Sequence, residues 1–487
     1  MIAPDPTLLV AIPLISAFCA PLLGLIREKL SGYTAIASSL LVLTISLLIA
    51  PLAIEEPIHY WAGGWKPPYG IELVIDSLSI FMLLLVSALS LCIAVYSQRS
   101  IEWELAGRTR HYYALFLILQ AGMMGVIVTA DIFNLYVFFE IMSIAAYGMI
   151  AMGKDRRALK ASFNYLIMGS IAVCFVLIGI GYIYSITGSV NMADIASKIS
   201  LDNHPYAIMI SLAFFIVGLS IKAALFPLHM WIPDAYAYAP QATTPFIEGA
   251  MGHVALYAVI RILFGVFGTD VLKSTGISDI LLVVSSIGMI VTAALAMVQI
   301  NLRKMLAYCS INQMGYIFFA ISTLNPMGIL GGMLHIMNHA MMKVGLFQAA
   351  GAIKQSAGLE DIPEFRGLGR GMPVTMLSFT IMALSIMGIP PLVGFVSKWY
   401  ISLGIIASGH WPYIIVIIVN TLMEFVYFLR VINVSYFTLG AAERKEAPVS
   451  MIAPTAVLAI ACILFGISVT PLRAMLDPVI GVLLGGV

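Results

Sequence analysis

Charged residues and cysteine pairs are both scarce in this sequence, and each shortage excludes a class of protein. Only 10% of the 487 residues are charged, whereas 61% are hydrophobic and the mean hydropathy is +1.01. The apolar runs are too long and too closely spaced for the two or three domains of a soluble chain of this length. The five cysteines occur singly, without a CxxC pair. We therefore expect no zinc site, no iron–sulfur cluster, no cofactor and no nucleic-acid partner.

Apolar segments of about 20 residues, the length that a bilayer core requires, recur fourteen times. No charged leader with a small-residue cleavage site precedes the first one, so no removable signal peptide is expected. The stretch 471–487 is interrupted by Pro471, Arg473 and Asp477, so we expect it to lie at the interface or to span only partly. The fourteen segments are 7–26, 33–54, 71–97, 111–130, 132–152, 161–185, 207–227, 242–267, 279–300, 305–324, 327–353, 372–405, 411–438 and 450–470.

Lysine and arginine are distributed unevenly between alternate loops. With an external N-terminus, sixteen lie in cytoplasmic loops and four in external ones. The positive-inside rule then predicts that both termini of this multi-pass protein lie outside. We expect it to lie in a prokaryotic cell membrane, in contact with lipid. The cytoplasmic residues are Arg27, Lys29, Arg99, Arg108, Arg110, Lys154, Arg156, Arg157, Lys160, Arg303, Lys304, Lys354, Arg366, Arg370, Arg444 and Lys445, and the external ones are Lys66, Lys198, Lys273 and Arg473.

Two of the apolar segments are interrupted by proline and carry a lysine nearby. Pro227 follows Lys222, and Pro390 and Pro391 precede Lys398. Proline leaves a helix carbonyl without its partner, which hydrocarbon tolerates only where protein or water satisfies it. Broken helices at matching positions in two halves are typical of repeat transporters, although both prolines could simply kink ordinary packing helices.

The matching breaks predict two repeats of five helices, with helices 7 and 12 broken. We divide the chain into a three-helix segment at 1–110, a first repeat at 111–270, a second repeat at 271–440, and a C-terminal helix with an interfacial tail at 441–487.

Titratable residues inside the predicted spans are the strongest functional signal. A charged side chain at mid-bilayer costs about 2.5–3.5 kcal/mol even on an insertion scale, so such residues pair with one another or line a wet path. The pattern indicates a protein that moves charge across a membrane. The residues are Glu140, Lys222, Glu248, His253, Arg261, His335, His339, Lys343, Lys398, Glu424 and Arg430.

Glu140 and Lys222 are expected to form a pair at similar depth in the first half. Burial and pairing shift their proton affinities in opposite directions, so a pair that opens and closes can switch the affinity of Lys222 for a proton. Arg261 and Arg430 end their helices, and we interpret both as interfacial or structural residues. Glu424 is interpreted either as a lateral relay group or as a partner for a lysine.

His335, His339 and Lys343 recur at i, i+4 and i+8, which aligns them on one helix face. Three protonatable groups on one stripe predict a proton relay. The two histidines could instead bind a metal, but no third ligand follows at zinc-like spacing. His253 lies between the two halves and is expected to pass protons between them. Glu248, like Glu424, is interpreted as a relay group or the partner of a cation.

Five motifs, in this order along the chain, resemble those of the antiporter-like subunits shared by respiratory complex I, group 4 membrane-bound hydrogenases and Mrp-type sodium/proton antiporters. The resemblance covers at least residues 70–440 and is greatest to the branch of Mrp D-type and hydrogenase subunits. The motifs are FFEIMSIAAYGMI around Glu140, KAALFPLHMWIPDAYAYAP at 222–240, RKMLAYCSINQMGY at 303–316, HIMNHAMMKVGLF at 335–347 and GIPPLVGFVSKWY at 388–400.

The resemblance implies an all-α fold of fourteen membrane helices with two inverted five-helix repeats. It also implies proton-translocation roles, which fall on Glu140, Lys222, His253, His335, His339 and Lys398. This sequence departs from the family where His253 replaces the commoner lysine, where Phe139 replaces a tryptophan, and where Glu248 adds an acid. The implied partners are other membrane subunits and peripheral hydrogenase or iron–sulfur subunits on the cytoplasmic side, with protons as cargo and sodium left open.

Three functions remain open at this stage. The first is a proton-translocating subunit of a redox-driven pump or an antiporter complex, with two half-channels joined by a lateral relay. The second is a self-sufficient sodium/proton antiporter, and the third is a structural membrane anchor for a hydrogenase or dehydrogenase. The chain has no redox or hydrolytic site of its own, so any enzyme activity would belong to a larger complex.

Overall fold

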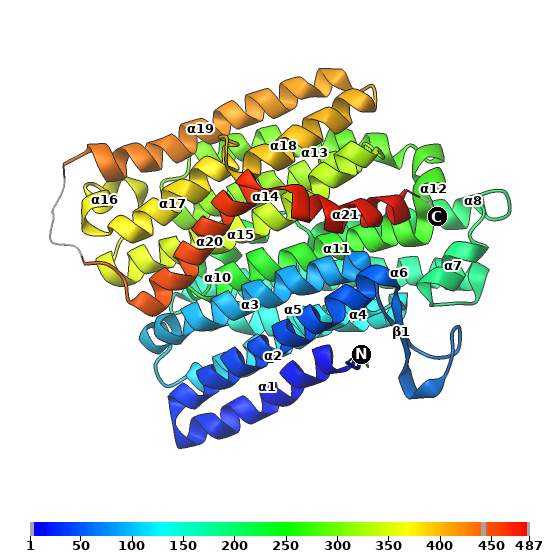
Figure 1. The fold of residues 1–487 in the computed structure, drawn as a ribbon, viewed down its shortest axis with the longest axis horizontal. Helices are drawn as coiled ribbons and strands as arrows, with labels where there is room; N and C mark the ends of the chain where they lie inside the picture. The colour runs from blue at the N-terminus through cyan, green and yellow to red at the C-terminus, as the bar shows by residue number, and fades with distance from the viewer. Residues whose placement is uncertain (1–3, 440–444, 485–487) are drawn as a thin grey trace.

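The chain folds into a bundle of helices whose long axes run roughly side by side (Figure 1). The computed structural model describes residues 4–439 and 445–484. The chain begins with three helices, α1 (Leu8–Ile26), α2 (Glu28–Glu55) and α3 (Ser77–Glu104). The next group is α4 (Thr109–Val128), α5 (Ile132–Ala151), α6 (Arg156–Thr187), α7 (Met192–Lys198), α8 (Pro205–Lys222), α9 (Ile232–Tyr238), α10 (Thr243–Phe246), the π-helical turn η2 (Ile247–Met251), α11 (Gly252–Ile262), a second π-helical turn η3 (Leu263–Phe267) and α12 (Gly268–Ser274).

A second group of helices follows, and two more complete the chain. The second group is α13 (Ile277–Met297), α14 (Leu302–Ile321), α15 (Pro326–Ala357), α16 (Leu368–Gly371), α17 (Pro373–Ile386), α18 (Val393–Ala407) and α19 (Ile414–Phe437). The last two helices are α20 (Val449–Ile467) and α21 (Thr470–Leu483). The 14-residue α21 is too short to span a bilayer, which requires about 20 residues, and it packs against α3 and α15.

Eleven helical segments of the described chain are long and apolar enough to cross a membrane. The other expected spans are α14, α15 and the α17–α18 pair, whose helices have 14 and 15 residues. Burial explains why α15 is not among these eleven segments. The 32-residue α15 is buried along most of its length, so it carries polar residues that a lipid-facing helix could not.

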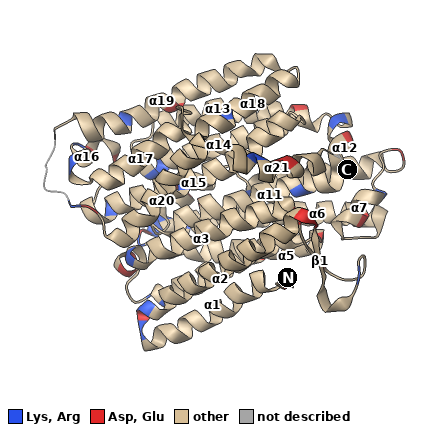
Figure 2. Cartoon of the chain, in the orientation of Figure 1, with Lys and Arg blue, Asp and Glu red and all other residues tan. Residues whose placement is uncertain are grey.

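The two ends of the bundle differ in structure and charge. At one end, β1 (Ile58–Trp61) and β2 (Glu72–Ile75) form an antiparallel hairpin, and we call this the hairpin end. The expected span at 71–97 was therefore wrong at its start, because 72–75 pair as a strand and the helix begins at Ser77. The opposite end carries α16, and Lys and Arg gather there (Figure 2). Among the loop cations expected on that side, Arg444 lies outside the described residues.

Matching β-bridges mark equivalent points in the two groups of helices. Asp131, before α5, bridges Asn191, and Asn301, before α14, bridges Asp361. Each bridge joins residues sixty positions apart, with the acid and the amide exchanged. Five crossings separate the two bridges along the chain, so they lie at opposite ends of the bundle. This arrangement is that of an inverted repeat, whereas the domain boundaries proposed above stay a prediction.

The two helix breaks also match in detail. Ala224 (φ 55°) and Gly388 (φ 78°) both take left-handed backbone conformations. The next residue in each case bonds back five positions, from Leu225 N–H to the Ser220 carbonyl at 2.9 Å and from Ile389 N–H to the Leu384 carbonyl at 3.1 Å. Pro227 and Pro391 follow at the same distance from the left-handed residue. The prolines therefore interrupt the helices at equivalent points.

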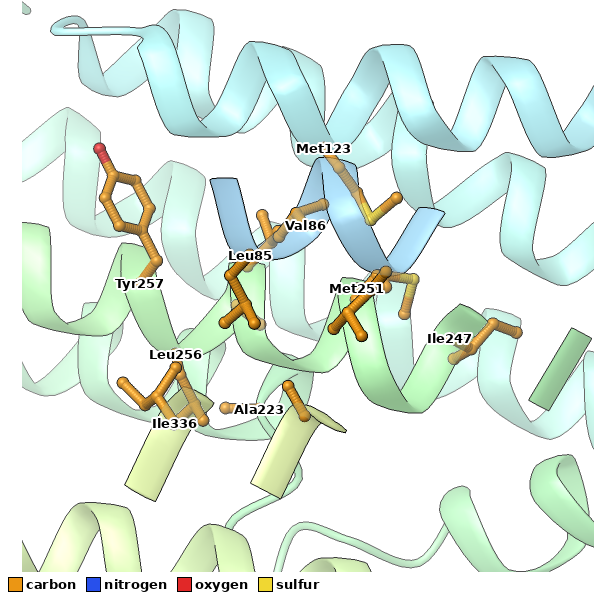
Figure 3. Close-up of a cluster of buried hydrophobic side chains, with 14 of the residues drawn as sticks. Leu85, Val86, Met123, Ala223, Ile247, Met251, Leu256, Tyr257 and Ile336 are labelled. Atoms are coloured by element: carbon orange, nitrogen blue, oxygen red, sulfur yellow. The ribbon is translucent and has the colours of Figure 1, made fainter. Parts of the chain in front are cut away.

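Apolar side chains enclose the central helix formed by η2 and α11. Figure 3 shows side chains of α3, α4 and α15, and Ala223 at the first break, packed around it. Val86, Met123, Leu256 and Ile336 are completely buried. This packing keeps bulk water and lipid away from the polar residues that the same helix carries.

Candidate functional site

The first buried polar group lies at the end of α8, where the helix breaks. Lys222 is almost fully buried, and its Nζ donates a hydrogen bond to Ser143 Oγ at 2.6 Å. Glu140 Oε1 lies 4.0 Å from the same ammonium group, so the expected ion pair exists but is loose. The Glu140 side chain is 31% exposed on the flank of the bundle. The pair is thus a buried cation that is hydrogen-bonded to a serine and lies beside a partly exposed acid.

The second group lies beyond the break in the other half. Lys398, on α18, donates to Glu424 Oε2 on α19 at 2.5 Å, and its ammonium lies over the Tyr316 ring at 4.7 Å. Glu424 is completely buried. This contact supports the interpretation of Glu424 as the partner of a lysine.

Amide side chains surround this ion pair. Gln313 donates to Glu424 Oε1 at 2.6 Å, and Asn420 donates to the same oxygen at 3.0 Å. Asn312 donates to Asn420 at 2.7 Å. All three amides are completely buried, and they hold the carboxylate in one place. Their amide groups cannot release a proton, so they orient charge without carrying it.

His335 connects the amide network to the next turn of α15. Its Nε2 lies 3.1 Å from Gln313 Oε1, which can only accept, so this nitrogen carries the proton in the neutral ring. Its Nδ1 lies 3.0 Å from Ser397 Oγ, which also lies 3.1 Å from the Gly394 carbonyl. The hydroxyl can turn from one acceptor to the other, so His335 can take up a second proton without losing this contact.

The third group occupies the centre of the bundle. His253 Nε2 lies 3.0 Å from His339 Nδ1, and His339 Nε2 lies 3.4 Å from Glu248 Oε1. The three side chains are completely buried and come from η2, α11 and α15. His335 and His339 stack in parallel with ring centroids 6.2 Å apart. The expected histidine stripe is therefore present, and Glu248 approaches His339 rather than His253.

Lys343 completes the stripe but makes a different contact. Its Nζ donates to the Leu306 carbonyl at 3.0 Å, and the side chain is completely buried. Within the described ranges, no group of three His, Cys, Asp or Glu side chains is arranged to hold a metal ion.

An aromatic cluster separates the first group from the centre. Tyr147 packs edge-on against Tyr165, which stacks on Trp231 with ring centroids 3.8 Å apart. Trp231 contacts Tyr236 in turn. These rings lie between the surroundings of Lys222 and those of Glu248, so a proton passing between the two must cross or bypass them. Trp231 also donates to the Ile221 carbonyl at 3.0 Å, which satisfies a carbonyl beside the break.

The two arginines lie apart from these three groups. Arg261 binds Asp76 with two nitrogens, at 2.6 and 2.7 Å. Arg430 donates to the carbonyls of Met297 and Gln299 at the end of α13. Both contacts fasten helix ends, which agrees with the structural interpretation of the two residues.

At the α16 end, a cavity of about 640 Å³ opens between α9, α14 and the segment after α15. It is lined by charged groups from both halves, and Lys304 lies 3.2 Å from Asp234 inside this region. Its other polar lining residues include Arg157, Asn301, Glu360 and Asp361. The cavity lies on the side where the sequence places the cytoplasm.

Sequence reasoning missed the uncharged members of the site. Ser143, Ser397 and Gln313 each bond a titratable side chain, yet serine and glutamine in an apolar helix carry no distinctive signal. One signal does exist. Ser143 and Gln313 both lie twelve residues after the bridge residues Asp131 and Asn301, so the internal repeat points to them as a matched pair.

The fold and the site together define a class: polytopic membrane proteins built from inverted repeats, with lysines and acids buried near broken helices. Residues 129–424 match the family described as NADH:quinone oxidoreductase/Mrp antiporter, transmembrane. This chain belongs to that family.

Comparisons with individual proteins agree with this assignment. The chain is 39% identical to NADH-quinone oxidoreductase subunit N of Desulforudis audaxviator, with 96% of each chain covered. It is 29% identical to the D-type subunit of the Na(+)/H(+) antiporter of Bacillus subtilis, covering 94% of this chain and 92% of that one. A chain in the structure of the membrane-bound sulfane sulfur reductase, an archaeal respiratory membrane complex, superimposes with a TM-score of 0.92 at 33% identity, covering 98% of this chain and 97% of that one.

Proposed function

We propose that this chain is a proton-translocating membrane subunit of a multi-subunit redox-driven pump or Mrp-type antiporter complex. The observation that carries the proposal is the series of buried titratable groups. One lies at each helix break and one lies between them, around Lys222, Glu248 and Lys398. Burying these groups costs free energy that a purely structural anchor would not need to spend. The relatives' names supply the cargo and the setting, because they include antiporter and oxidoreductase subunits.

The three groups suit a pump because the links between them do not conduct protons unaided. The Gln313 amide separates His335 from Glu424, and the aromatic cluster separates Lys222 from Glu248. His335 and His339 stack at 6.2 Å without a hydrogen bond between them among the described contacts. Each link must rearrange or admit water for a proton to pass. A path with such gates can move protons in one direction when the gates open in turn.

In this proposal, protons enter from the cytoplasmic side near Lys222, pass the central group of Glu248, His253 and His339, and leave by way of His335 and Lys398. Opening of the loose Glu140–Lys222 pair lowers the proton affinity of Lys222. Lys343 sets the local charge near the central group, and Glu424 sets it near the exit group. Both termini face outside, and the α16 end faces the cytoplasm. The proposal covers proton transport and makes no assignment for sodium.

The flank that carries Glu140 supports an assembly with other membrane subunits. A carboxyl group that is 31% exposed in a membrane-spanning helix is costly against lipid, and a neighbouring subunit would cover it. Peripheral hydrogenase or iron–sulfur subunits would bind at the cytoplasmic side, where the cations of the α16 end gather.

The test is Lys222→Ala in the assembled complex. We expect proton translocation in vesicles, measured by dye quenching, to fall by about a hundredfold or more, as for loss of a positioned proton-transfer group. Assembly of the complex should be unchanged. Lys273→Ala is the matched control, because Lys273 is exposed on α12, and it should transport normally. Normal transport by Lys222→Ala would refute the proposal.

A further inference from the structure

The central group is a loop of polar contacts that begins and ends on one residue, and two of its three links are hydrogen bonds. His253 Nδ1 lies 3.1 Å from the backbone carbonyl of Glu248. His253 Nε2 lies 3.0 Å from His339 Nδ1, and His339 Nε2 lies 3.4 Å from the Glu248 carboxyl. The loop therefore leads from the carboxyl of Glu248 through two imidazoles to the carbonyl of the same residue.

The carbonyl fixes which nitrogen of each ring carries a proton. A carbonyl oxygen can only accept, so neutral His253 carries its proton on Nδ1 and leaves Nε2 as an acceptor. His339 must then carry its proton on Nδ1, which donates to His253. The Nε2 of His339 is left as an acceptor facing Glu248. A proton on the Glu248 carboxyl reaches this nitrogen after a small shift of either side chain, because the two groups lie 3.4 Å apart without a hydrogen bond.

The π-helical turn places this carbonyl. In η2, Gly252 N–H bonds to the carbonyl of Ile247, five residues back, whereas an α-helix bonds four back. The altered turn brings the Glu248 carbonyl within reach of the His253 ring. π-helices occur mostly as single turns inside α-helices, and such turns are frequent at functional sites.

The loop limits what His253 can do with a proton. If the Glu248 O–H bond breaks and an N–H bond forms at His339 Nε2, the Nδ1 proton of His339 can pass to His253 Nε2. The products are a carboxylate and an imidazolium, and the loop has neither gained nor lost a proton. The imidazolium cannot pass a proton on through Nδ1, because a peptide carbonyl is not a proton carrier. The proton can only return.

We infer that Glu248 is the residue that binds the central transported proton, that His339 exchanges it, and that His253 is a positioning residue that fixes the tautomer and orientation of His339. This inference rests on the proposed function and divides the roles within its central group: Glu248 and His339 carry the proton, and His253, which the sequence places among the carriers, positions His339 instead. His335 and His339 stack with ring centroids 6.2 Å apart, so a proton passes from His339 to His335 only when one of the rings turns or water enters between them. Lys343 lies outside the loop, since its ammonium is held by the Leu306 carbonyl.

The decisive variant is His253→Gln in the assembled complex. A glutamine amide can accept from His339 and donate to the Glu248 carbonyl, but it cannot take up a proton. We expect proton transport within about threefold of the parent, the scale of one exchanged neutral hydrogen bond, and an unchanged pH profile. Glu248→Gln and His339→Gln remove the proton-binding groups and should each lower transport about a hundredfold.

The His253→Leu variant tests whether His253 positions His339 through a hydrogen bond or only fills the space beside it. It leaves the His339 N–H without an acceptor, so we expect a loss well beyond that of His253→Gln. His111→Gln is the control, because His111 is an exposed histidine on α4, outside the loop, and it should transport normally. Assembly of each complex is checked by size-exclusion chromatography.

Two results would overturn the inference while leaving the proposed function intact. One is a loss in His253→Gln as large as in Glu248→Gln, or a shifted pH profile in what activity remains, because His253 would then carry the proton itself. The other is normal transport by Glu248→Gln while Lys222→Ala is inactive. If Lys222→Ala and Glu248→Gln both transport normally, the proposed function fails instead.

Discussion

Asp76 and Arg261 show, at the scale of single residues, how this chain buries charge outside its transport path. Arg261 reaches Asp76 with two nitrogens at 2.6 and 2.7 Å, and Ser79 Oγ and Tyr257 contact the same guanidinium. Each of the three guanidinium nitrogens has an acceptor. This closed pairing contrasts with Glu248, whose carboxyl oxygens lack a hydrogen-bond partner among the described residues. The first arrangement fastens α3 to α11, whereas the second leaves a carboxyl able to bind a proton.

The Asp76–Arg261 pair predicts a pH dependence of stability. Burial alone would raise the pKa of Asp76, but the charge and hydrogen bonds of Arg261, with those of Ser79, hold it below its usual range. A lowered pKa contributes stability at pH values above the unfolded-state pKa of about 4, and this stability is lost as the pH falls below it. The Tm of the detergent-solubilised protein should therefore fall as the pH is lowered below about 4.

Arg261→Met tests the same pair. We expect it to destabilise the protein by about 3 kcal/mol at neutral pH, because it leaves a partly buried carboxylate without its partner. It should also remove most of the acid-dependent fall in Tm that Asp76 contributes. Thermal unfolding at several pH values measures both effects. An unchanged Tm at neutral pH would contradict this account of the pair.

At the scale of elements, the two broken helices share a backbone geometry but place their lysines differently. Lys222 precedes the left-handed residue Ala224, whereas Lys398 lies ten positions after its counterpart Gly388. The equivalent breaks therefore present one lysine from the first half of a broken helix and the other from the second half. The two breaks therefore match in backbone geometry but not in the position of the lysine.

Gly388→Ala should destabilise the second break. A φ of 78° is left-handed, which costs a residue with a Cβ roughly 1–2 kcal/mol, and the new Cβ would lie 3.3 Å from Lys398 Cδ. We expect a lower Tm together with reduced transport, because Lys398 would shift. Gly181→Ala is the control. Gly181 lies in α6 with open space around it, so alanine there should be neutral or stabilising by about 0.5–1 kcal/mol.

At the scale of the whole molecule, the charge of the loops predicts which end faces the cytoplasm. Single cysteines placed in 155–160, at the α16 end, should be shielded from an impermeant thiol reagent in intact cells. Those placed in 197–203, at the hairpin end, should react. Cys19, Cys92 and Cys174 are replaced by serine first, because they are wholly or partly exposed. The reversed labelling pattern would overturn the proposed orientation, which rests on the positive-inside rule.

Much of the architecture followed from local patterns. Apolar length located the spans, because a bilayer requires a fixed number of helical residues. Pro227 and Pro391 located the breaks, because proline cannot donate to the helix. The titratable residues at Lys222, Glu248 and Lys398 were evident for the same kind of reason, since a charge in hydrocarbon is costly wherever it occurs. The β1–β2 hairpin was missed, because its second strand is apolar and adjoins a helix.

What the sequence by itself determined is therefore which groups are buried and charged, since that depends only on composition and depth. Which groups meet was decided by the tertiary structure. Glu424 binds Lys398, Lys222 binds Ser143, and Glu248 lies against His339. Each contact joins different helices, and a helical period gives no information on how helices rotate against one another. The π-helical turn at 247–251 likewise depends on the packing around it, and it places the carbonyl that sets the direction of the hydrogen bond between His253 and His339.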